Sequence, residues 1–278
     1  MAHDVLPTQT DQARIERERQ FWDEHARTAL GGHPPEDYRT GPDDRYDRTV
    51  PWLPYIGMPA YVERVLQEIG DVSGKSVLDL GTGSGFLAAL LAARGAQVDA
   101  VDVSDASLEL ARIRAHLSGV TDRVRLHNMP VEALGFADNS FDRVAGVFLL
   151  HHLDLARSLA EIHRVLRPGG VAAFIETSAR NKLLMAARST LAGRFGIEKA
   201  GSEDEAPLDR TAHRILADSS FSRVEYCFPN LLFFRMAGYM PWARFGPLPA
   251  IWSGLDTVAG MIPGLRVFSY FVVVILRK

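Results

Sequence analysis

The stretch VLDLGTGSG, residues Val77–Gly85, combines an apolar run with one acid and then three glycines at alternate positions. A helical pattern, FLAALLAARG, follows at once and ends at Gly95. A glycine turn between a strand and a helix presents backbone N–H and C=O groups to a ligand that lies across the strand end. The glycines alone predict only a turn, so the identity of any ligand depends on the residues that surround them.

Strands and helices alternate along the chain beyond this stretch. Strand composition is found in SVLDLG, AQVDAVDVS, RVRLHN, FDRVAGVFLL and VAAFIET. Helical patterns separate them at DASLELARIRAHLSG and at LARSLAEIHRVLRPGG, where we expect Pro168-Gly169-Gly170 to end the helix. This alternation predicts an α/β fold with a doubly wound, mostly parallel sheet and helices on both faces.

Two further segments lie outside the alternation. Residues 1–74 hold a charged amphipathic helix and then a stretch rich in Pro, Gly and aromatic residues, which predicts an N-terminal helical lid. Residues 75–278 form the predicted main domain, and residues 178–263 an insertion that contributes to a substrate pocket. The final run FSYFVVVIL, residues 268–276, is well short of the ~20 residues of a spanning helix. We expect it to be a buried strand.

Composition excludes several classes of protein. The 278 residues carry 31 Lys and Arg against 34 Asp and Glu, so no net positive charge attracts nucleic acid or an anionic membrane. The single cysteine, Cys227, excludes a disulfide framework and any cysteine-based metal site. The first 30 residues are too charged for a secretory signal. We therefore expect a cytoplasmic enzyme without a membrane span, and the sequence leaves a homodimer open.

The residues around the glycine turn favour one class of ligand. Asp102 ends the neighbouring strand, at the offset where a carboxylate accepts hydrogen bonds from a ribose diol. A dinucleotide would need the spacing G-x-G-x-x-G, whereas this chain has G-x-G-x-G preceded by Asp79. An anion suits a cationic ligand better than a pyrophosphate. S-adenosylmethionine, which carries an ammonium and a sulfonium, is such a ligand.

Four motifs in order carry a family resemblance: VLDLGTGSG, VDAVDVS, ALGFADNSFDRVAGVFLLHHL and EIHRVLRPGGVAAFIE. Over residues 61–177 the chain resembles the class I S-adenosylmethionine-dependent methyltransferases, of the small-molecule type called methyltransferase-11-like. The resemblance implies a Rossmann-like sheet of seven strands whose last strand is antiparallel. It also implies S-adenosyl-L-methionine as cofactor and S-adenosyl-L-homocysteine as product.

The resemblance assigns cofactor contacts residue by residue. Asp79 and the turn from Gly81 to Gly85 would surround the methionyl part, Asp102 the ribose and Val103 the adenine face. The chain departs from the family pattern at Pro130, where an acid is usual, so Asn128 or the backbone of Met129 and Val131 would meet the adenine edge. The expected cofactor residues are Asp79, Gly81, Thr82, Gly83, Gly85, Asp102, Val103, Asn128, Met129, Val131 and Phe148.

Methyl transfer needs mainly alignment, with a base where the acceptor must lose a proton. His151 and His152 follow the fourth strand, and histidine has a suitable pKa for that role. The structural alternative is that one imidazole packs on the sheet and the other caps the next helix. Glu176 is either a pocket residue or a loop anchor. The expected substrate pocket comprises Phe21, Trp22, Tyr46, His152, Glu176, Phe234, Tyr239 and Trp242, and no metal site is expected.

The aromatic insertion permits two interpretations, a subdomain core and an acceptor pocket, and we expect a mixture of both. It contains Phe233, Phe234, Met236, Tyr239, Met240, Trp242, Phe245 and Trp252. A small, hydrophobic or aromatic acceptor of the natural-product type, methylated on O, N or C, is the leading hypothesis. The alternatives are methylation of a peptide carboxylate and a non-methylating reaction, such as cyclisation or decarboxylation, that uses the cofactor.

Overall fold

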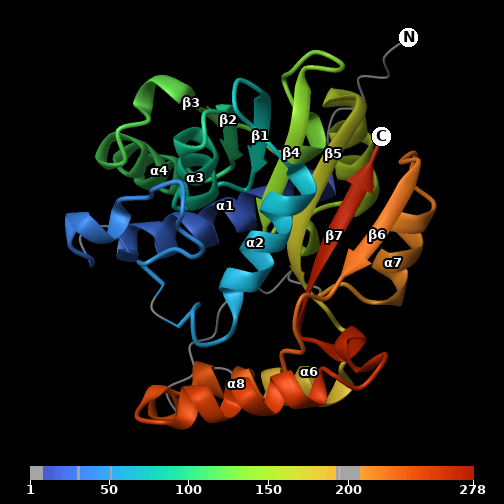
Figure 1. Ribbon diagram of the computed structural model, residues 1–278. Helices are drawn as coiled ribbons and strands as arrows, with labels where there is room; N and C mark the ends of the chain where they lie inside the picture. The colour runs from blue at the N-terminus through green and yellow to red at the C-terminus, as the bar shows by residue number, and fades with distance from the viewer. Residues whose placement is uncertain (1–8, 30–31, 51, 192–193, 195–206) are drawn as a thin grey trace.

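The computed structural model describes residues 9–29, 32–50, 52–191, 194 and 207–278. Its centre is a seven-stranded sheet in the order β3-β2-β1-β4-β5-β7-β6 (Figure 1). The strands are β1 Ser76–Leu80, β2 Gln97–Asp102, β3 Val124–Asn128, β4 Phe141–Val147, β5 Leu166–Thr177, β6 Arg223–Cys227 and β7 Phe271–Arg277. The first five are joined in parallel, and β7 runs antiparallel to both β5 and β6. The predicted fold class and the antiparallel last strand are confirmed.

Helices cover both faces of this sheet. The helices are α1 Gln9–Ala29, α2 Met58–Ile69, α3 Phe86–Ala93, α4 Asp105–Leu117, α5 Leu155–Val165, α6 Lys182–Leu191, α7 Arg210–Ala217 and α8 Leu248–Ala259. Side chains of β7 alternate between two cores: Val273 and Ile275 pack with α2 and α3, whereas Val272 and Val274 pack with α5 and α7. None of the helices in the described part of the chain combines the length and apolar character that crossing a bilayer requires.

The end of α5 differs from the sequence prediction. The helix ends at Val165, before the Pro-Gly-Gly turn, and β5 already begins at Leu166. The helix ends there because the carbonyls of Arg164 and Val165 accept hydrogen bonds from the N–H groups of Asn139 and Ser140, at 3.0 and 2.8 Å. The fully buried Leu166 side chain then fixes the chain against the sheet. β7 likewise begins at Phe271, three residues later than expected.

Helix α2 belongs to the segment for which we predicted a lid. It buries one face, formed by Met58, Tyr61, Val62, Val65, Leu66 and Ile69. This face packs against β4, β5 and β7 (Figure 1). The Tyr61 hydroxyl, hydrogen bonded to the Ser269 hydroxyl at 2.8 Å, fixes the helix to the start of β7. Residues 53–72 therefore contribute to the main core, and the domain boundary at residue 74 remains a prediction.

A cap of short helices lies beyond the end of the sheet at which β4 and β5 terminate (Figure 1). It comprises α6, α8 and the 3-10 turns η5 Phe234–Tyr239, η6 Pro241–Arg244 and η7 Leu265–Phe268. Pro247 and Pro249 lie at the start of α8, where a missing N–H costs little. Trp242 and Phe245 are exposed, so this part of the aromatic segment is not the core that the sequence suggested.

The N-terminal segment is attached to the glycine turn by a buried arginine. Arg114 of α4 is fully buried and donates to both carboxylate oxygens of Asp47, at 2.7 and 2.8 Å. It also donates to the Ser84 carbonyl at 2.8 Å and to the Thr40 hydroxyl at 3.1 Å. The Ser84 hydroxyl donates to Asp47 at 2.5 Å. One guanidinium thus joins residues 40–47 to the turn that follows β1.

Replacing this arginine tests the attachment. We expect Arg114→Met to lower the free energy of unfolding by about 3–5 kcal/mol, because it leaves the Asp47 carboxylate buried without its charge partner. Urea denaturation measures the difference. Arg112→Met, on the exposed side of the same helix, is the matched control and should cost less than about 1 kcal/mol. Equal effects of the two substitutions would contradict the structural role of Arg114.

Candidate functional site

The glycines of the turn between β1 and α3 share one backbone conformation, but Gly83 and Gly85 have different surroundings. Gly81, Gly83 and Gly85 have positive φ angles of 62°, 50° and 78°, a region that other residues enter at a cost. A Cβ on Gly85 would lie 2.6 Å from the Ala111 Cα, so this glycine lets α3 and α4 pack closely. A Cβ on Gly83 would meet no atom within 4 Å. The backbone at Gly83 therefore borders open space that a ligand can occupy.

Asp102 connects the end of β2 to this turn. Its carboxylate accepts the N–H of Gly83 and the N–H of Ser104, each at 2.9 Å. Burial raises the pKa of this carboxyl above its usual range. A carboxylate offers about four lone-pair positions. The backbone N–H groups do not take all of them, so Asp102 can still accept from a ribose hydroxyl.

Asp79, the acid within the strand, is enclosed. Only 1% of the residue is exposed, and the Thr82 hydroxyl donates to its carboxylate at 2.7 Å. Burial, with a smaller contribution from the nearby charge of Asp102, raises the pKa of Asp79 to about 7. A cation close to the turn would favour the ionised form of this carboxyl.

The predicted adenine-side residues lie where β2 and β3 end side by side. Asp102 pairs with Asn128 in the parallel register. The Asn128 amide donates to the Asp105 carboxylate at 2.6 Å and to the Val103 carbonyl at 3.3 Å. The Met129 N–H donates to the Asp102 carbonyl at 3.2 Å. Val131 begins the adjoining turn η3 Val131–Ala133 and is buried.

A buried carboxylate organises the loop after β4. Phe148 has a φ of 55°, unusual for a residue with a side chain. Glu176, fully buried at the end of β5, accepts the N–H groups of Leu149 and Leu150 at 3.0 and 2.8 Å. Its other oxygen lies 2.5 Å from the His151 Nδ1. Glu176 therefore anchors the loop and orients one of the two predicted histidines.

His152 faces the N-terminal helix instead. Its Nδ1 lies 3.3 Å from a Glu18 carboxylate oxygen, and the Trp22 indole packs edge-on at 5.6 Å between ring centroids. The Trp22 Nε1 also donates to Glu18, at 3.0 Å. Neither histidine caps α5, because the Asp154 carboxylate accepts the Arg157 N–H at 3.1 Å. Helix α1 thus reaches the strand ends, where the predicted lid would lie.

Aromatic rings connect the cap to the end of β4. We call this group the aromatic wall: Trp52, Phe148, Tyr239, Tyr270 and Phe271. Ring centroids are 4.8 Å apart for Trp52 and Tyr239, 6.4 Å for Tyr239 and Tyr270, 5.0 Å for Tyr270 and Phe271, and 4.9 Å for Phe271 and Phe148. Sequence analysis named Tyr239 for the pocket but missed Trp52, Tyr270 and Phe271, because they come from two segments that are distant in sequence from Tyr239. The aromatic content of PWLPY and FSYF is the signal that was present.

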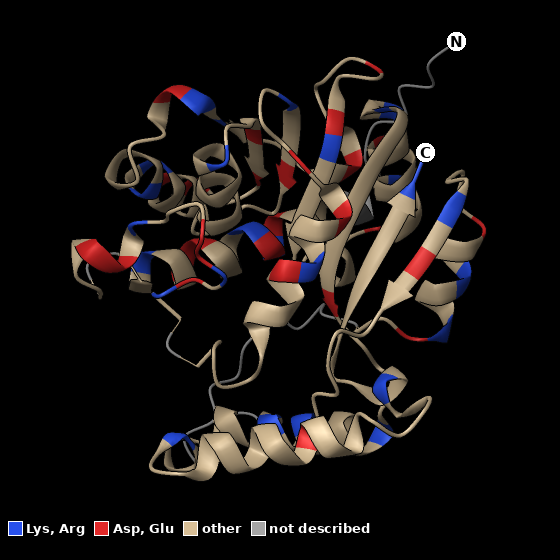
Figure 2. Cartoon of the chain, in the orientation of Figure 1, with Lys and Arg blue, Asp and Glu red and all other residues tan. Residues whose placement is uncertain are grey.

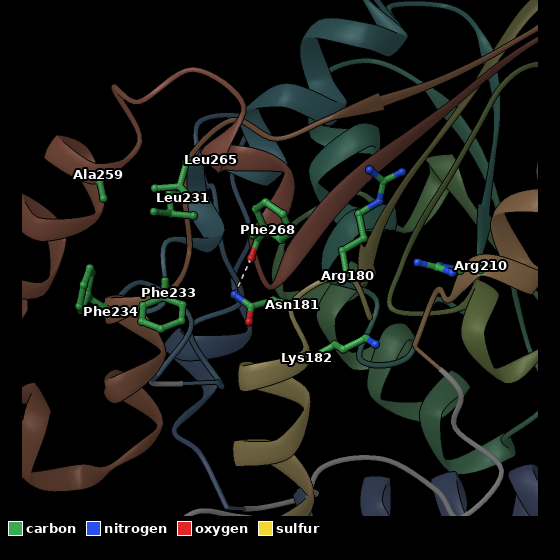
Figure 3. Close-up of a pocket in the computed structure, with 10 residues that line it drawn as sticks. All are labelled: Arg180, Asn181, Lys182, Arg210, Leu231, Phe233, Phe234, Ala259, Leu265 and Phe268. Carbon is green, nitrogen blue, oxygen red and sulfur yellow. Dashed lines mark hydrogen bonds between the residues drawn. The ribbon is translucent and has the colours of Figure 1, made fainter.

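A cavity of about 660 Å³ lies within the cap (Figure 3). Its lining comprises Arg180, Asn181, Lys182, Arg210, Leu231, Phe233, Phe234, Ala259, Leu265 and Phe268. In Figure 3 the cationic side chains stand on one side and the apolar ones on the other. Of the residues predicted for the substrate pocket, Phe234 lines this cavity. The others named in the sequence lie elsewhere: Phe21 and Trp22 are on α1, Tyr46 packs against a hydrophobic core, and Trp242 is exposed. The structure therefore distributes the predicted pocket residues over several regions.

Among the described residues, no group of three or more His, Cys, Asp or Glu side chains is arranged to hold a metal ion.

Comparisons with known proteins identify the family. A family model described as "Methyltransferase domain" matches residues 78–174. The ubiquinone/menaquinone biosynthesis C-methyltransferase UbiE of Desulfotalea psychrophila is 34% identical over 181 residues, which cover 63% of this chain and 70% of the relative. The methyltransferase GfsG of Streptomyces halstedii is 37% identical over 44% of each chain. The chain therefore belongs to the class I S-adenosylmethionine-dependent methyltransferases.

A solved structure supports the fold over nearly the whole chain. Geranyl diphosphate C-methyltransferase from Streptomyces coelicolor A3(2), crystallised with S-adenosyl-L-homocysteine, has a TM-score of 0.60 at 16% identity and covers 95% of this chain and 98% of its own. Among the curated relatives, by contrast, the match spans less than half of GfsG. The family model matches the segment from β1 and the glycine turn to β5.

The residues present fit the cofactor of this family. The open space beside Gly83 admits a ligand, Asp102 retains acceptor capacity for ribose hydroxyls, and Asp79 becomes an anion when a cation is near. S-adenosyl-L-methionine has each of the matching groups. Asp79, Gly83 and Asp102 would hold it across the ends of β1 and β2.

The raised pKa of Asp79 makes a prediction about pH. The pKa of Asp79 is about 7 in the folded protein and about 4 in the unfolded chain. The folded protein therefore binds the proton more tightly, and its free energy of unfolding falls as pH rises from about 4 to about 7. Relative to Asp79→Asn, the ligand-free wild type should therefore lose on the order of 4 kcal/mol of unfolding free energy across that range. Denaturation at several pH values measures the difference. A difference that is constant with pH would show that Asp79 titrates normally.

Proposed function

We propose that this protein transfers the methyl group of S-adenosyl-L-methionine to an oxygen, nitrogen or carbon of a small, hydrophobic or aromatic organic acceptor. The observation that carries the proposal is the pair of carboxylates on either side of an open glycine turn, the buried Asp79 and the half-buried Asp102. The partly buried members of the aromatic wall, Trp52, Phe148 and Tyr239, support the acceptor class, since sites for organic ligands are lined mainly by apolar and aromatic side chains.

Alignment supplies most of the chemistry in this proposal. When bound, the cofactor supplies an electrophilic methyl group on sulfur, and an in-line displacement requires the acceptor to lie opposite that sulfur. The glycine turn and Asp102 fix the nucleoside end, and the loop anchored by Glu176 borders the place for the acceptor. Closure of α1 over the strand ends would exclude water.

His151 is the better candidate for a general base. A base oriented by a third group is a recurring catalytic arrangement, and Glu176 holds the His151 ring at Nδ1. That contact assigns the proton to Nδ1 and the lone pair to Nε2. His152 has a longer contact of the same kind, because its Nδ1 lies 3.3 Å from a Glu18 oxygen of α1, against 2.5 Å between His151 and Glu176. His151 would accept a proton from a hydroxyl acceptor, which favours oxygen methylation.

The names of the relatives are consistent with small organic acceptors. They include a demethylmenaquinone methyltransferase, a ubiquinone biosynthesis O-methyltransferase and GfsG. The proposal does not extend to the quinones of those names. We place the protein in the cytoplasm, because its one thiol and the lack of a disulfide framework suit a reducing compartment.

Substitution of Asp102 tests the cofactor site. We expect Asp102→Ala to weaken S-adenosyl-L-homocysteine binding at least about tenfold, because it removes hydrogen bonds from a charged acceptor to the ribose. Titration calorimetry measures the affinity. Asp138→Ala, on an exposed acid away from the strand ends, is the control and should leave the affinity unchanged. An unchanged affinity for Asp102→Ala would remove the ribose assignment.

Substitution of the two histidines tests the base. We expect His151→Ala to lower turnover about 10²-fold or more while cofactor affinity stays the same, and Glu176→Gln to shift the pH profile of turnover. His152→Ala is the matched comparison and should have the smaller effect on turnover. The assay measures S-adenosyl-L-homocysteine formed with a panel of phenolic and quinol acceptors. Conversion of an acceptor without formation of S-adenosyl-L-homocysteine would favour the non-methylating alternative. An unchanged rate in both histidine variants would mean that neither histidine acts as the base.

A further inference from the structure

Helix α8 carries an apolar stripe on its exposed side. Ile251, Leu255, Val258 and Ile262 are spaced by four, three and four residues, which places them along one face of the helix and its continuation. Their exposed fractions are 45%, 42%, 67% and 57%. A helix that packs only on its own domain normally keeps such a face inward, so this stripe points to something outside the protein.

Neighbouring side chains extend the stripe into a surface. We call it the apolar cap surface: Leu183, Trp242, Phe245, Ile251, Leu255, Val258, Met261 and Ile262, all of them exposed. Apart from Tyr55 and Phe268, these are all of the large apolar side chains that are exposed in the described part of the chain. Exposed apolar groups are normally scattered, and their concentration in one region marks an interaction surface.

The same region is cationic, although the whole chain has a net charge of −3. Residues 180–191 and 229–268 contain one acid, Asp256, and six basic residues: Arg180, Lys182, Arg188, Arg235, Arg244 and Arg266. Asp256 is buried and accepts the N–H groups of Phe233, Phe234 and Arg235, so it adds little negative charge outside. Figure 2 shows blue segments along this layer and a single red one. The net charge of the sequence thus conceals a local excess of positive charge.

We propose that the apolar cap surface docks on an anionic lipid bilayer. The exposed apolar face of α8, with Lys and Arg on the neighbouring segments, resembles the composition of interfacial helices, whose apolar face enters the headgroup region. Exposed Trp is also favoured at that depth. A second copy of the chain is the weaker occupant, because symmetric pairing would bring two cationic surfaces together. The proposal does not depend on the acceptor or on methyl transfer.

Vesicle co-sedimentation of the full chain tests the proposal. The probes are vesicles of phosphatidylcholine alone and of phosphatidylcholine with phosphatidylglycerol in equal parts. We expect the wild type to partition at least about tenfold more strongly onto the mixed vesicles, and added salt to reduce the difference. Leu255→Gln with Val258→Gln, which keeps the charge and a helix-forming residue, should lower partitioning at least about tenfold.

Single-charge variants separate the electrostatic contribution. Lys182→Gln, within the cationic region, should lower partitioning onto mixed vesicles by roughly fivefold. Arg112→Gln, an exposed site on α4, removes the same charge elsewhere and should leave partitioning unchanged. Equal thermal unfolding midpoints of the variants and the wild type verify that the fold is retained.

Two results would overturn the proposal. The first is a wild type that stays in the supernatant with both vesicle compositions. The second is a wild-type dimer by light scattering that the double glutamine variant converts to a monomer without any change in vesicle binding. That second result would assign the apolar cap surface to another copy of the chain.

Discussion

The arrangement of the N-terminal segment depends on the guanidinium of Arg114. A fully buried cation is tolerated only when a counter-charge and acceptors surround it. Asp47, Thr40 and the Ser84 carbonyl supply them, from the segment before the sheet and from the glycine turn itself. The turn, α4 and the first part of the chain are consequently held as one unit. A movement of residues 40–47 must therefore carry the glycine turn and α4 with it.

Carboxylates converge on the same end of the sheet. Asp23 of α1 accepts from the Ser104 hydroxyl at 2.6 Å and from the Ala106 N–H at 3.1 Å, next to Asp102 at the start of α4. With Asp79 behind the turn, three acids lie around the ends of β1 and β2 without a salt bridge from Arg114. Such a field disfavours an anionic ligand and favours a positively charged one. Asp79 and Asp102 accept hydrogen bonds from N–H and O–H donors, whereas Asp23 also forms an ion pair with Arg27 at 3.2 Å.

Local features of the site were predictable, and long-range ones were not. The turn and Asp102 follow directly from a strand, three glycines and a second strand, so proximity in sequence fixes their proximity in space. Arg114 is a cation within a helical pattern, and its partners lie about seventy residues earlier along the chain, so nothing local marks it as buried. The aromatic wall joins residues from the first, middle and last parts of the chain. The early end of α5 depends on N–H donors from a preceding loop, which the composition of the helix does not reveal.

The backbone at Phe148 stores conformational energy. A residue with a side chain at a φ of 55° costs on the order of 1–3 kcal/mol, and the surroundings must supply this. Glu176 offsets this cost, because one of its carboxylate oxygens accepts hydrogen bonds from the N–H groups of Leu149 and Leu150. Its second oxygen contacts the His151 ring. One carboxylate thus holds both the strained backbone after β4 and the ring of His151. A change in the Glu176 side chain would therefore alter the backbone at the strand end and the orientation of the His151 ring together.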